Sequence, residues 1–240
     1  MTDHAILTSE AHRDLRVRTG RSAALGDAVM SCLVVPSEFR RVQNDYPILF
    51  RLSPERDSYM AVALFGFETG ENLFLDGDRW DAGYRPLAID IQPFLIGRSA
   101  DEAGPKQVHI DMASPRLDRN AGEGIRLFDE NGRPTPYLDG IAEKLGELDD
   151  GYRSSADFFA ALRRHELLEP LTLEVTLENG STHRLVGFHG IDEDQLRALD
   201  GVALGELHEA GHLLPIFMAL ASLSNITALV ERKNRGLRHG

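Results

Sequence analysis

The sequence predicts an α+β fold, in which an antiparallel, strand-rich N-terminal half packs with helices from the C-terminal half. Short apolar runs that end at Pro, Gly or Asp follow one another closely in the first half. This spacing is typical of antiparallel sheets rather than of βαβ units. The last third holds a long apolar segment, residues 202–230. A chain in which strands come first and helices follow is expected to form an α+β fold.

Six strands are expected in the first half, and a hairpin follows later. The six apolar or alternating runs are residues 29–35, 45–50, 61–67, 72–75, 89–96 and 107–112. Further on, residues 173–177 alternate apolar and polar side chains, Asn179-Gly180 follows, and residues 182–188 form the return strand. Asn-Gly between two such runs is the strongest short signal for a β-hairpin.

Helices are expected after the first half. Residues 137–148 and 156–166 have amphipathic patterns, and Ser154 or Ser155 would cap the second helix. Residues 192–194, Asp-Glu-Asp, place acidic groups where the positive end of a helix dipole favours them. The apolar segment after residue 202 is interpreted as more than one helix, because residues 222–225 resemble the end of one helix and the cap of the next.

The chain is predicted to form one domain behind a flexible arm. Residues 1–24 are polar and of mixed charge, so a flexible N-terminal arm is expected there. Residues 25–240 are expected to be a single α+β domain, since no repeat and no low-complexity linker divides them. Residues 149–153 are a candidate seam, but so short a segment does not establish two domains.

Composition narrows the classes of function. The chain has a net charge of −12, and phosphate binding needs clustered Lys and Arg, so no nucleic-acid partner is expected. A single cysteine, Cys32, excludes an intramolecular disulfide. The first residues are charged and lack an apolar core, which argues against a secretory signal peptide. A cytoplasmic protein is therefore expected.

An apolar stretch near the C-terminus raises the question of a membrane segment. Residues 210–230 carry no Asp, Glu, Lys or Arg, and about 20 mainly apolar residues can span a bilayer. However, the stretch also contains Pro215, Ser222, Ser224 and Asn225. We therefore expect a buried pair of core helices and no membrane insertion.

The residues His208-Glu209-x-x-His212 spell the motif of zinc proteases. In those enzymes two histidines four residues apart share a helix face and bind zinc, while the glutamate acts as general base. Here Glu209 would be the base and Glu231 the third metal ligand. Pro215, three residues after the second histidine, would kink such a helix. No bound cofactor is therefore expected, and a zinc hydrolase is kept as the alternative.

Two further patterns could carry chemistry. His109-x-Asp111, completed by His183 or His189, is the composition of a non-haem iron triad. The simpler interpretation is a polar sheet face. The second pattern is a set of four carboxylates: Asp76, Asp78, Asp81 and Glu123. Paired carboxylates can hydrolyse glycosides. The alternative interpretation is that these are ordinary turn residues.

The loop at residues 76–86 is the predicted binding site. The flanking runs, residues 72–75 and 87–96, are expected to be strands that hold it rigidly. The loop mixes acidic, basic and aromatic side chains, which recognise ligands when a scaffold fixes them. The competing interpretation is that its tryptophan fills the core. The residues expected to bind are Asp76, Asp78, Trp80, Tyr84 and Arg85.

Taken in order, a series of short motifs resembles the SapC family of bacterial proteins, over about residues 29–232. No single motif is specific, but their order and spacing together are. The motifs are DYPILF at 45–50, NLFLD at 72–76, Trp80, YRP at 84–86, PF at 93–94, EGIRLF at 123–128, Gly132, PT at 134–135, LVGF at 185–188, DEDQL at 192–196 and SLSNI at 222–226.

The resemblance implies a function only in outline. The family is named for a link to bacterial surface-layer formation, and its genes often neighbour halogenase-like, cupin-like and outer-membrane receptor genes. It brings no catalytic residues to this chain. The resemblance therefore implies a non-enzymatic binding or accessory protein with a protein or peptide partner, linked to surface-layer, peptide-modification or uptake systems. Neither the sequence nor the resemblance indicates an oligomeric state.

Overall fold

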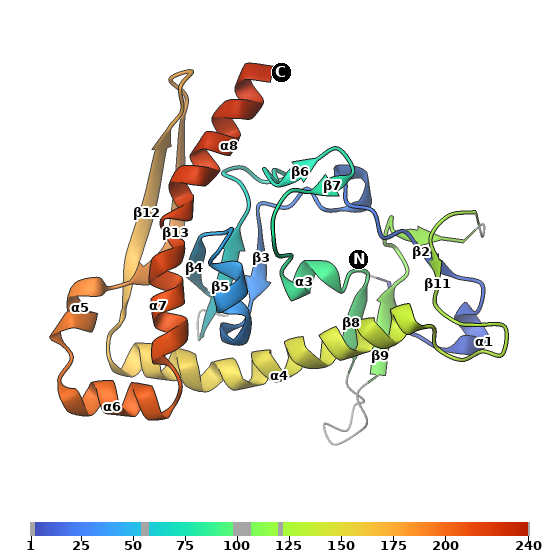
Figure 1. The fold of residues 1–240 in the computed structure, drawn as a ribbon, viewed down its shortest axis with the longest axis horizontal. Helices are drawn as coiled ribbons and strands as arrows, with labels where there is room; N and C mark the ends of the chain where they lie inside the picture. The colour runs from blue at the N-terminus through green and yellow to red at the C-terminus, as the bar shows by residue number, and fades with distance from the viewer. Residues whose placement is uncertain (1–2, 54–57, 98–106, 120–121, 240) are drawn as a thin grey trace. The chain divides into compact units, whose positions relative to one another are not determined.

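The structure is a computed structural model that describes residues 3–53, 58–97, 107–119 and 122–239 (Figure 1). The fold is mixed α+β, as predicted: antiparallel sheets lie mostly in the first half of the chain, and long helices in the C-terminal part pack against strands. Contacts within the chain divide it into two compact units. Unit 1 is Met1–Ala28, Leu75–Trp80 and Leu87–Asp150, and unit 2 is Val29–Phe74, Asp81–Pro86 and Gly151–Gly240.

Unit 1 contains small antiparallel sheets and short helices. The strands of its first sheet, in spatial order, are β1 (His4–Ile6), β9 (Gln107–Asp111) and β8 (Phe94–Gly97). Those of the second are β10 (Leu117–Asp118), β2 (Arg16–Val17) and β11 (Ile125–Arg126), and β6 (Leu75–Asp76) pairs with β7 (Arg79–Trp80). The helical elements are α1 (Ser9–His12), a 3₁₀ turn (Ala23–Leu25), α3 (Leu87–Asp90) and the first half of α4 (Pro136–Arg164).

The core of unit 1 lies between α4 and these strands. Leu138, Ile141 and Leu145 are spaced three and four residues apart, so they share one face of α4, and all three are buried. Ile110 of β9 and Leu127 are fully buried in the same cluster.

The N-terminal segment, expected as a flexible arm over residues 1–24, is part of this core. β1 pairs with β9, and β2 pairs with both β10 and β11. Val17 of β2 is fully buried, and Leu15 is 7% exposed. These strands have only three and two residues, so charged neighbours hide their pattern in the sequence. Met1 and Thr2 of the expected arm lie outside the described residues.

Unit 2 is built on a five-stranded antiparallel sheet. Three of its strands confirm the predictions for residues 29–35, 45–50 and 61–67 to within a few residues. Leu49, Phe50 and Ala63 are fully buried in them. In spatial order the strands are β12 (Leu168–Thr176), β13 (Thr182–Ile191), β4 (Ile48–Leu52), β5 (Tyr59–Leu64) and β3 (Ser31–Val34).

The hairpin predicted at Asn179-Gly180 is present as β12 and β13. Thr176 pairs with Thr182 next to the turn, and Leu168 pairs with Ile191 at the far end. Gly180 has a φ of +83°, a backbone conformation that glycine adopts without steric cost. Local turn chemistry is therefore enough to specify this element.

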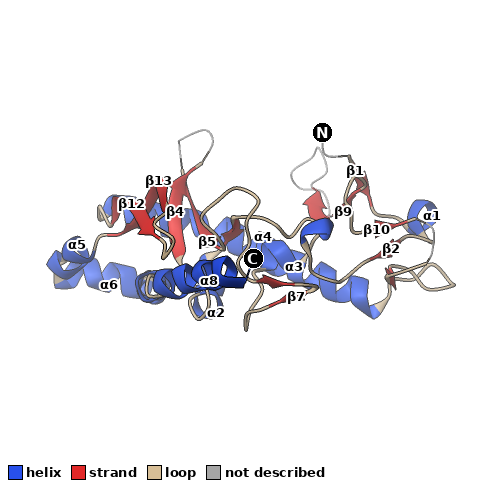
Figure 2. Ribbon diagram, turned by 90° about the horizontal axis from the view of Figure 1, so that it is seen from above, coloured by secondary structure: helices blue, strands red, loops and turns tan. Residues whose placement is uncertain are grey.

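Helices cover one face of this sheet (Figure 2). α7 contacts β13, β4 and α2. Phe39 of α2 makes edge-to-face ring contacts with Phe50 of β4 and Phe158 of α4, at centroid distances of 6.4 and 6.0 Å. The helical elements are a 3₁₀ turn (Pro36–Glu38), α2 (Phe39–Val42), the second half of α4, α5 (Glu193–Ala198), α6 (Gly201–Glu209), α7 (Leu213–Ser222) and α8 (Asn225–His239).

α4 is a single helix of 29 residues, although the sequence predicts two helices, at 137–148 and 156–166. Gly151, at the expected break, lies inside the helix. A Cβ at this position would lie 2.7 Å from the side chain of Val35. The glycine therefore permits close packing and does not end the helix. The boundary between the two units, after Asp150, falls inside the segment noted as a candidate seam.

The two serines expected to cap a helix at residue 156 instead bond back to the helix that contains them. The Ser154 hydroxyl donates to the Gly151 carbonyl at 3.1 Å, and the Ser155 hydroxyl donates to the Tyr152 carbonyl at 2.6 Å. Serine inside a helix commonly bonds to a preceding carbonyl in this way. Cap-type residues therefore gave a false start signal here.

Two of the six expected strands take other forms. In residues 72–75 only Leu75 enters a strand, because the Asn72 side chain accepts the Phe74 N–H at 3.0 Å and forms a turn. In residues 89–96, α3 occupies the first positions and β8 begins only at Phe94, after a cis Gln92-Pro93 bond. The predicted strands on both sides of the loop at 76–86 are therefore wrong.

The break between α7 and α8 is where the sequence predicts it, at residues 222–225. The expectation that the two helices are buried is wrong, because each packs through one face only. Ile216 and Leu229 are 0% and 1% exposed, whereas Leu214 and Phe217 are 54% and 48% exposed.

One helical stretch, Leu213–Arg238, is long and apolar enough to cross a membrane by length and composition alone. In its most apolar part, 22% of the residues are buried. Core helices of water-soluble proteins meet the same criterion, but they are mostly buried. The observation that matters for function is therefore the exposed apolar face of α7.

Candidate functional site

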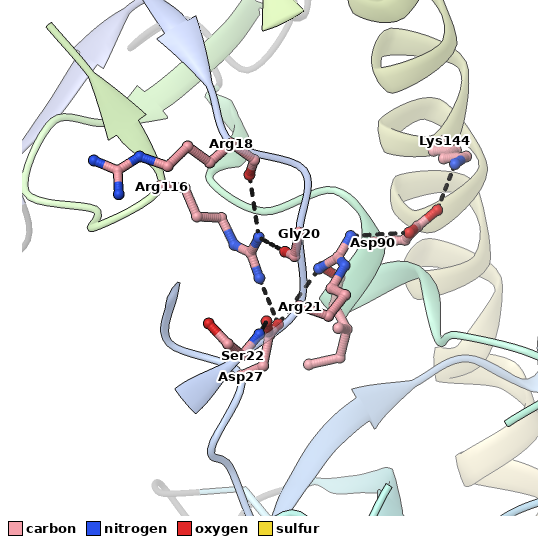
Figure 3. Close-up of polar contacts among 9 residues, drawn as sticks. Arg18, Gly20, Arg21, Ser22, Asp27, Asp90, Arg116 and Lys144 are labelled. Atoms are coloured by element: carbon pink, nitrogen blue, oxygen red, sulfur yellow. Dashed lines mark hydrogen bonds and ion pairs between the residues drawn. The ribbon is translucent and has the colours of Figure 1, made fainter. Parts of the chain in front are cut away.

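Unit 1 contains a buried ion network (Figure 3). Asp27 is 0% exposed and Arg116 is 1% exposed. The Arg116 guanidinium donates to one carboxylate oxygen of Asp27 and, at 2.9 Å, to the Gly20 carbonyl. The other oxygen of Asp27 accepts the Ser22 N–H at 2.9 Å. Both charges are thus paired and hydrogen-bonded, as buried charges must be.

Arg21 extends this network to α3 and α4. One of its nitrogens donates to Asp27 at 3.4 Å and to the Ile89 carbonyl at 3.1 Å, and another donates to Asp90 at 3.1 Å. The second oxygen of Asp90 pairs with Lys144 of α4. The network ties residues 18–27 to two helices of the same unit. We therefore interpret its role as structural.

The five residues predicted to bind a partner are divided between the units. Asp76, Asp78 and Trp80 belong to unit 1, and Tyr84 and Arg85 belong to unit 2. The two aspartates and the arginine are exposed, whereas the tryptophan is 8% exposed. This burial favours a core role for the tryptophan. The loop stays a predicted binding site through its exposed members.

Tyr84 is held in place within unit 2. Its hydroxyl donates to the buried carboxylate of Glu38 at 2.8 Å, and its backbone N–H donates to Asp45 at 3.2 Å. Its carbonyl accepts a hydrogen bond from the Tyr46 hydroxyl, and the Arg41 guanidinium lies 4.8 Å from the centre of its ring. This end of the loop is therefore anchored by side chains rather than by the flanking strands that the sequence predicts.

The zinc-protease motif is not formed as a continuous helix. α6 ends at Glu209, so that His208 lies in α6 while His212 precedes α7. Gly211, between them, has a φ of +73°, which ends a helix readily. Glu231 lies in α8. Within the described residues, no group of three or more His, Cys, Asp or Glu side chains is arranged to hold a metal ion.

The second metal pattern is distributed over both units. His109 and Asp111 lie on β9 of unit 1, and His183 and His189 lie on β13 of unit 2. His183 is 3.3 Å from the carboxylate of Glu68. The structure gives these histidines sheet positions, as the simpler interpretation of the sequence expects.

The four candidate carboxylates also belong to different units. Asp76, Asp78 and Glu123 are in unit 1, and Asp81 is in unit 2. Asp81 pairs with Arg232 of α8 at 2.7 Å. Asp76 pairs with its neighbour Arg79 at 2.9 Å on the surface. These partners are typical of turn and surface residues.

A groove in unit 2 brings together segments that are far apart in the sequence. One hollow of about 440 Å³ lies between the 3₁₀ turn at Pro36–Glu38, α4 and the start of α7. A second hollow of about 300 Å³ lies between α4 and α6. Both are lined by Asp157, Ala210 and His212, so they adjoin. We call them together the α4–α7 groove.

The α4–α7 groove combines apolar and polar side chains. Phe158 and Met218 are among its apolar lining, and Arg40, Asp157 and His212 supply polar groups. The His212 ring lies edge-to-face on Phe158, at 5.6 Å between ring centres. Such a mixture of apolar surface with a few convergent polar groups is typical of ligand sites.

Burial gives His212 a defined charge state. Desolvation lowers the pKa of His212 below the usual histidine value, and the nearby carboxylate of Asp157 opposes this shift. Near neutral pH the imidazole is therefore uncharged, with one donor nitrogen and one acceptor nitrogen. A neutral imidazole can hydrogen-bond a peptide group without the cost of burying a charge.

The same groove contains serines beside His212 and Asp157, a set of residue types used in nucleophilic catalysis. That chemistry needs a serine hydroxyl that donates to the histidine. Ser154 donates its proton to the Gly151 carbonyl of its own helix, which leaves none for His212.

Sequence reasoning identified His212, but as a metal ligand, and missed Asp157 and Arg40. In the sequence Asp157 is one polar residue on an amphipathic helix, and Arg40 belongs to a charged turn. No local pattern joins them, since they meet only through packing of α4 against α2 and α7. The one available signal was Gly211, whose helix-ending role places His212 at the start of a new helix.

Comparison with known proteins agrees with the motif pattern. The model of the SapC family matches residues 7–229 of the chain. This match spans the ion network, the loop at 76–86 and the α4–α7 groove. No curated protein and no solved structure matches the chain. The chain therefore belongs to the SapC family.

Proposed function

We propose that this protein is a non-enzymatic binding protein whose α4–α7 groove holds a short peptide segment of a partner protein. The observation that carries the proposal is the groove itself. Its two adjoining hollows form a path along α4, which suits a chain better than a compact small molecule. Asp157, Ala210 and His212 stand where the two hollows meet.

The lining matches the chemistry of a peptide. Pro215 and Met218 are half-buried and offer apolar surface for a side-chain anchor, and Met side chains are enriched at binding surfaces. The neutral imidazole of His212 can both donate to and accept from a peptide backbone. Arg40 and Asp157 carry opposite charges, so they would fix the direction of a bound chain.

The biological setting is proposed from the family. A cytoplasmic accessory protein that holds a peptide segment would fit a link to surface-layer, peptide-modification or uptake systems. The exposed residues of the loop at 76–86 remain a proposed second contact for the same partner. Another hollow of unit 2, of about 460 Å³, lies between β3, β5 and α4. The groove is the primary site in this proposal because its two hollows adjoin and together form a longer path.

Panning of a phage-displayed peptide library on the purified protein tests the proposal. Peptides should be enriched, and their affinity should fall strongly in Ala210→Trp, which fills the point where both hollows meet. Ala198→Trp is the matched control, because Ala198 is exposed at the end of α5 and does not line the groove. Failure to enrich any peptide, or equal binding by both variants, would contradict peptide binding in the groove.

A further inference from the structure

A second surface of unit 2 consists of exposed positions that repeat along α7 and α8. Leu214, Phe217, Ala221, Ser224 and Ala228 are all exposed. They are spaced alternately three and four residues apart, which is the repeat of a coiled-coil seam. We call these five residues the α7 stripe. Its first three residues lie on α7 and span about 10 Å at the rise of an α-helix, Ser224 lies in the turn between α7 and α8, and Ala228 lies on α8.

The α7 stripe faces away from the core of its own unit. Ile216, Ala219 and Ser222 lie on the opposite face and are buried. The Ser222 hydroxyl accepts the Ile48 N–H of β4 at 2.8 Å, which fixes the rotation of α7 on the sheet. The large apolar side chains of the stripe therefore cannot turn inward. Exposed apolar helix faces of this kind mark interaction surfaces.

Side-chain size along the α7 stripe is self-complementary. The large residues, Leu214 and Phe217, occupy its N-terminal end, and the small residues, Ser224 and Ala228, occupy its C-terminal end. A twofold axis through Ala221 would place Leu214 against Ala228 and Phe217 against Ser224 of an antiparallel second copy. An interface between identical copies must be self-complementary in this way, whereas the surface for a different partner need not be.

Charges near the two ends agree with the same arrangement. Exposed Glu209 lies just before α7, and exposed Arg235 lies near the end of α8. An antiparallel pair brings these opposite charges toward each other, whereas a parallel pair would bring like charges together. Other basic groups of α8 are engaged within unit 2: Arg232 pairs with Asp81, and Lys233 pairs with Glu71. Together with the net charge of −12, this disfavours an anionic membrane surface as the occupant.

We propose that the α7 stripe is the seam of a symmetric, antiparallel homodimer. This goes beyond the proposed peptide binding and does not rest on it. Leu214 of the stripe also lines one hollow of the α4–α7 groove. Phe217 lines neither hollow, so Phe217→Glu can break the seam while the groove is kept. A dimer would also place two grooves in one particle.

Sedimentation equilibrium of the full chain tests the dimer. The wild type should have twice the monomer mass of 26.6 kDa. Phe217→Glu should weaken association by roughly 30-fold or more, the effect of losing an interface hot spot, without changing the circular dichroism spectrum. Val202→Glu, at another exposed apolar position on α6, should leave the dimer intact.

Cysteine cross-linking tests the antiparallel direction in a Cys32→Ala background. A disulfide needs Cα atoms within about 7 Å of each other. In an antiparallel homodimer, only a residue on the twofold axis lies this close to the same residue of the second copy. Ala221→Cys should therefore cross-link, and Leu214→Cys should not. A monomeric wild type, a dimer that persists in Phe217→Glu, or equal cross-linking of both cysteine variants would overturn the proposal. Monomers that float with phospholipid vesicles would assign the stripe to a membrane instead.

Discussion

The buried ion network of unit 1 and the exposed apolar helix face of unit 2 are opposite departures from a polar surface over an apolar core. Unit 1 holds buried charge, with Asp27 at 0% exposure against Arg116 at 1%. Unit 2 exposes apolar side chains, with Leu214 and Phe217 about half exposed on a regular helix. Each arrangement costs free energy in an isolated chain unless something compensates for it.

The compensation lies in different places. In unit 1 it is internal, because each carboxylate of the network accepts hydrogen bonds from basic side chains or backbone of the same unit. In unit 2 the large side chains of the α7 stripe are about half exposed in the described part of the chain, and the proposed second copy would cover them. The difference separates side chains that specify the fold from those available for binding.

Breaking the ion network should have the largest effect on stability. Asp27→Ala leaves the guanidinium of Arg116 buried without its carboxylate, and breaking a buried pair costs about 3–5 kcal/mol. The measurement is urea unfolding followed by fluorescence of Trp80, the single tryptophan, which lies in unit 1. In the control, Asp76→Ala removes an exposed pair and should cost less than about 1 kcal/mol. Equal losses of unfolding free energy in both variants would contradict a structural role for the network.

Removing the tryptophan should have an effect of similar size. At 8% exposure, Trp80→Ala should cost about 3–5 kcal/mol through the cavity it leaves. Thermal unfolding followed by circular dichroism measures this, and Asp78→Ala, at an exposed loop position, should change little. An unchanged melting temperature would instead support a role for Trp80 as a binding anchor.

In unit 2, a buried and an exposed residue of α7 should differ in their effect on stability. Ile216→Ala should cost about 2–5 kcal/mol, because its side chain is fully buried. Leu214→Ser should change the free energy of unfolding of the monomer by no more than about 0.5 kcal/mol, as the side chain points outward. Chemical denaturation at low protein concentration measures both. A large loss in Leu214→Ser would mean that the α7 stripe supports its own unit.

The smallest effect concerns pH. Burial lowers the pKa of His189 and of His212, so the folded protein binds these protons less tightly than the unfolded chain does. Unfolding then takes up protons, and the free energy of unfolding should fall as pH decreases from about 6.5, the usual histidine pKa, through the lowered values. Both side chains are partly solvated, so the loss should be modest. The double variant His189→Gln, His212→Gln should flatten this dependence between pH 7 and 5; an unchanged slope would assign it to other groups.

Local chemistry made part of the fold predictable. The Asn179-Gly180 hairpin and the break at residues 222–225 depend on turn and cap residues that act within a few positions. The continuity of α4 was not predictable in this way, because Gly151 signals a break locally while its actual role is close contact with Val35. The small strands β1 and β2 are too short to produce a pattern.

The candidate site was less predictable than the fold. Arg40, Asp157 and His212 are separated by long stretches of sequence, and only packing brings them together. The sequence did identify the aromatic loop residues, but it gave no information on which of them are buried. The exposure of α7 was also hidden, because a helix with an apolar outer face has the same composition as a core helix.

In the proposed function the α4–α7 groove of unit 2 is the binding site, whereas the buried charges of unit 1 have a structural role. Hydrogen exchange measured by mass spectrometry, with and without a peptide enriched on this protein, tests it most directly. With the peptide bound, exchange should slow in residues 36–42, 153–165 and 206–218 and should not change in residues 16–28 and 107–118. Protection confined to residues 75–86, or spread over unit 1, would contradict it.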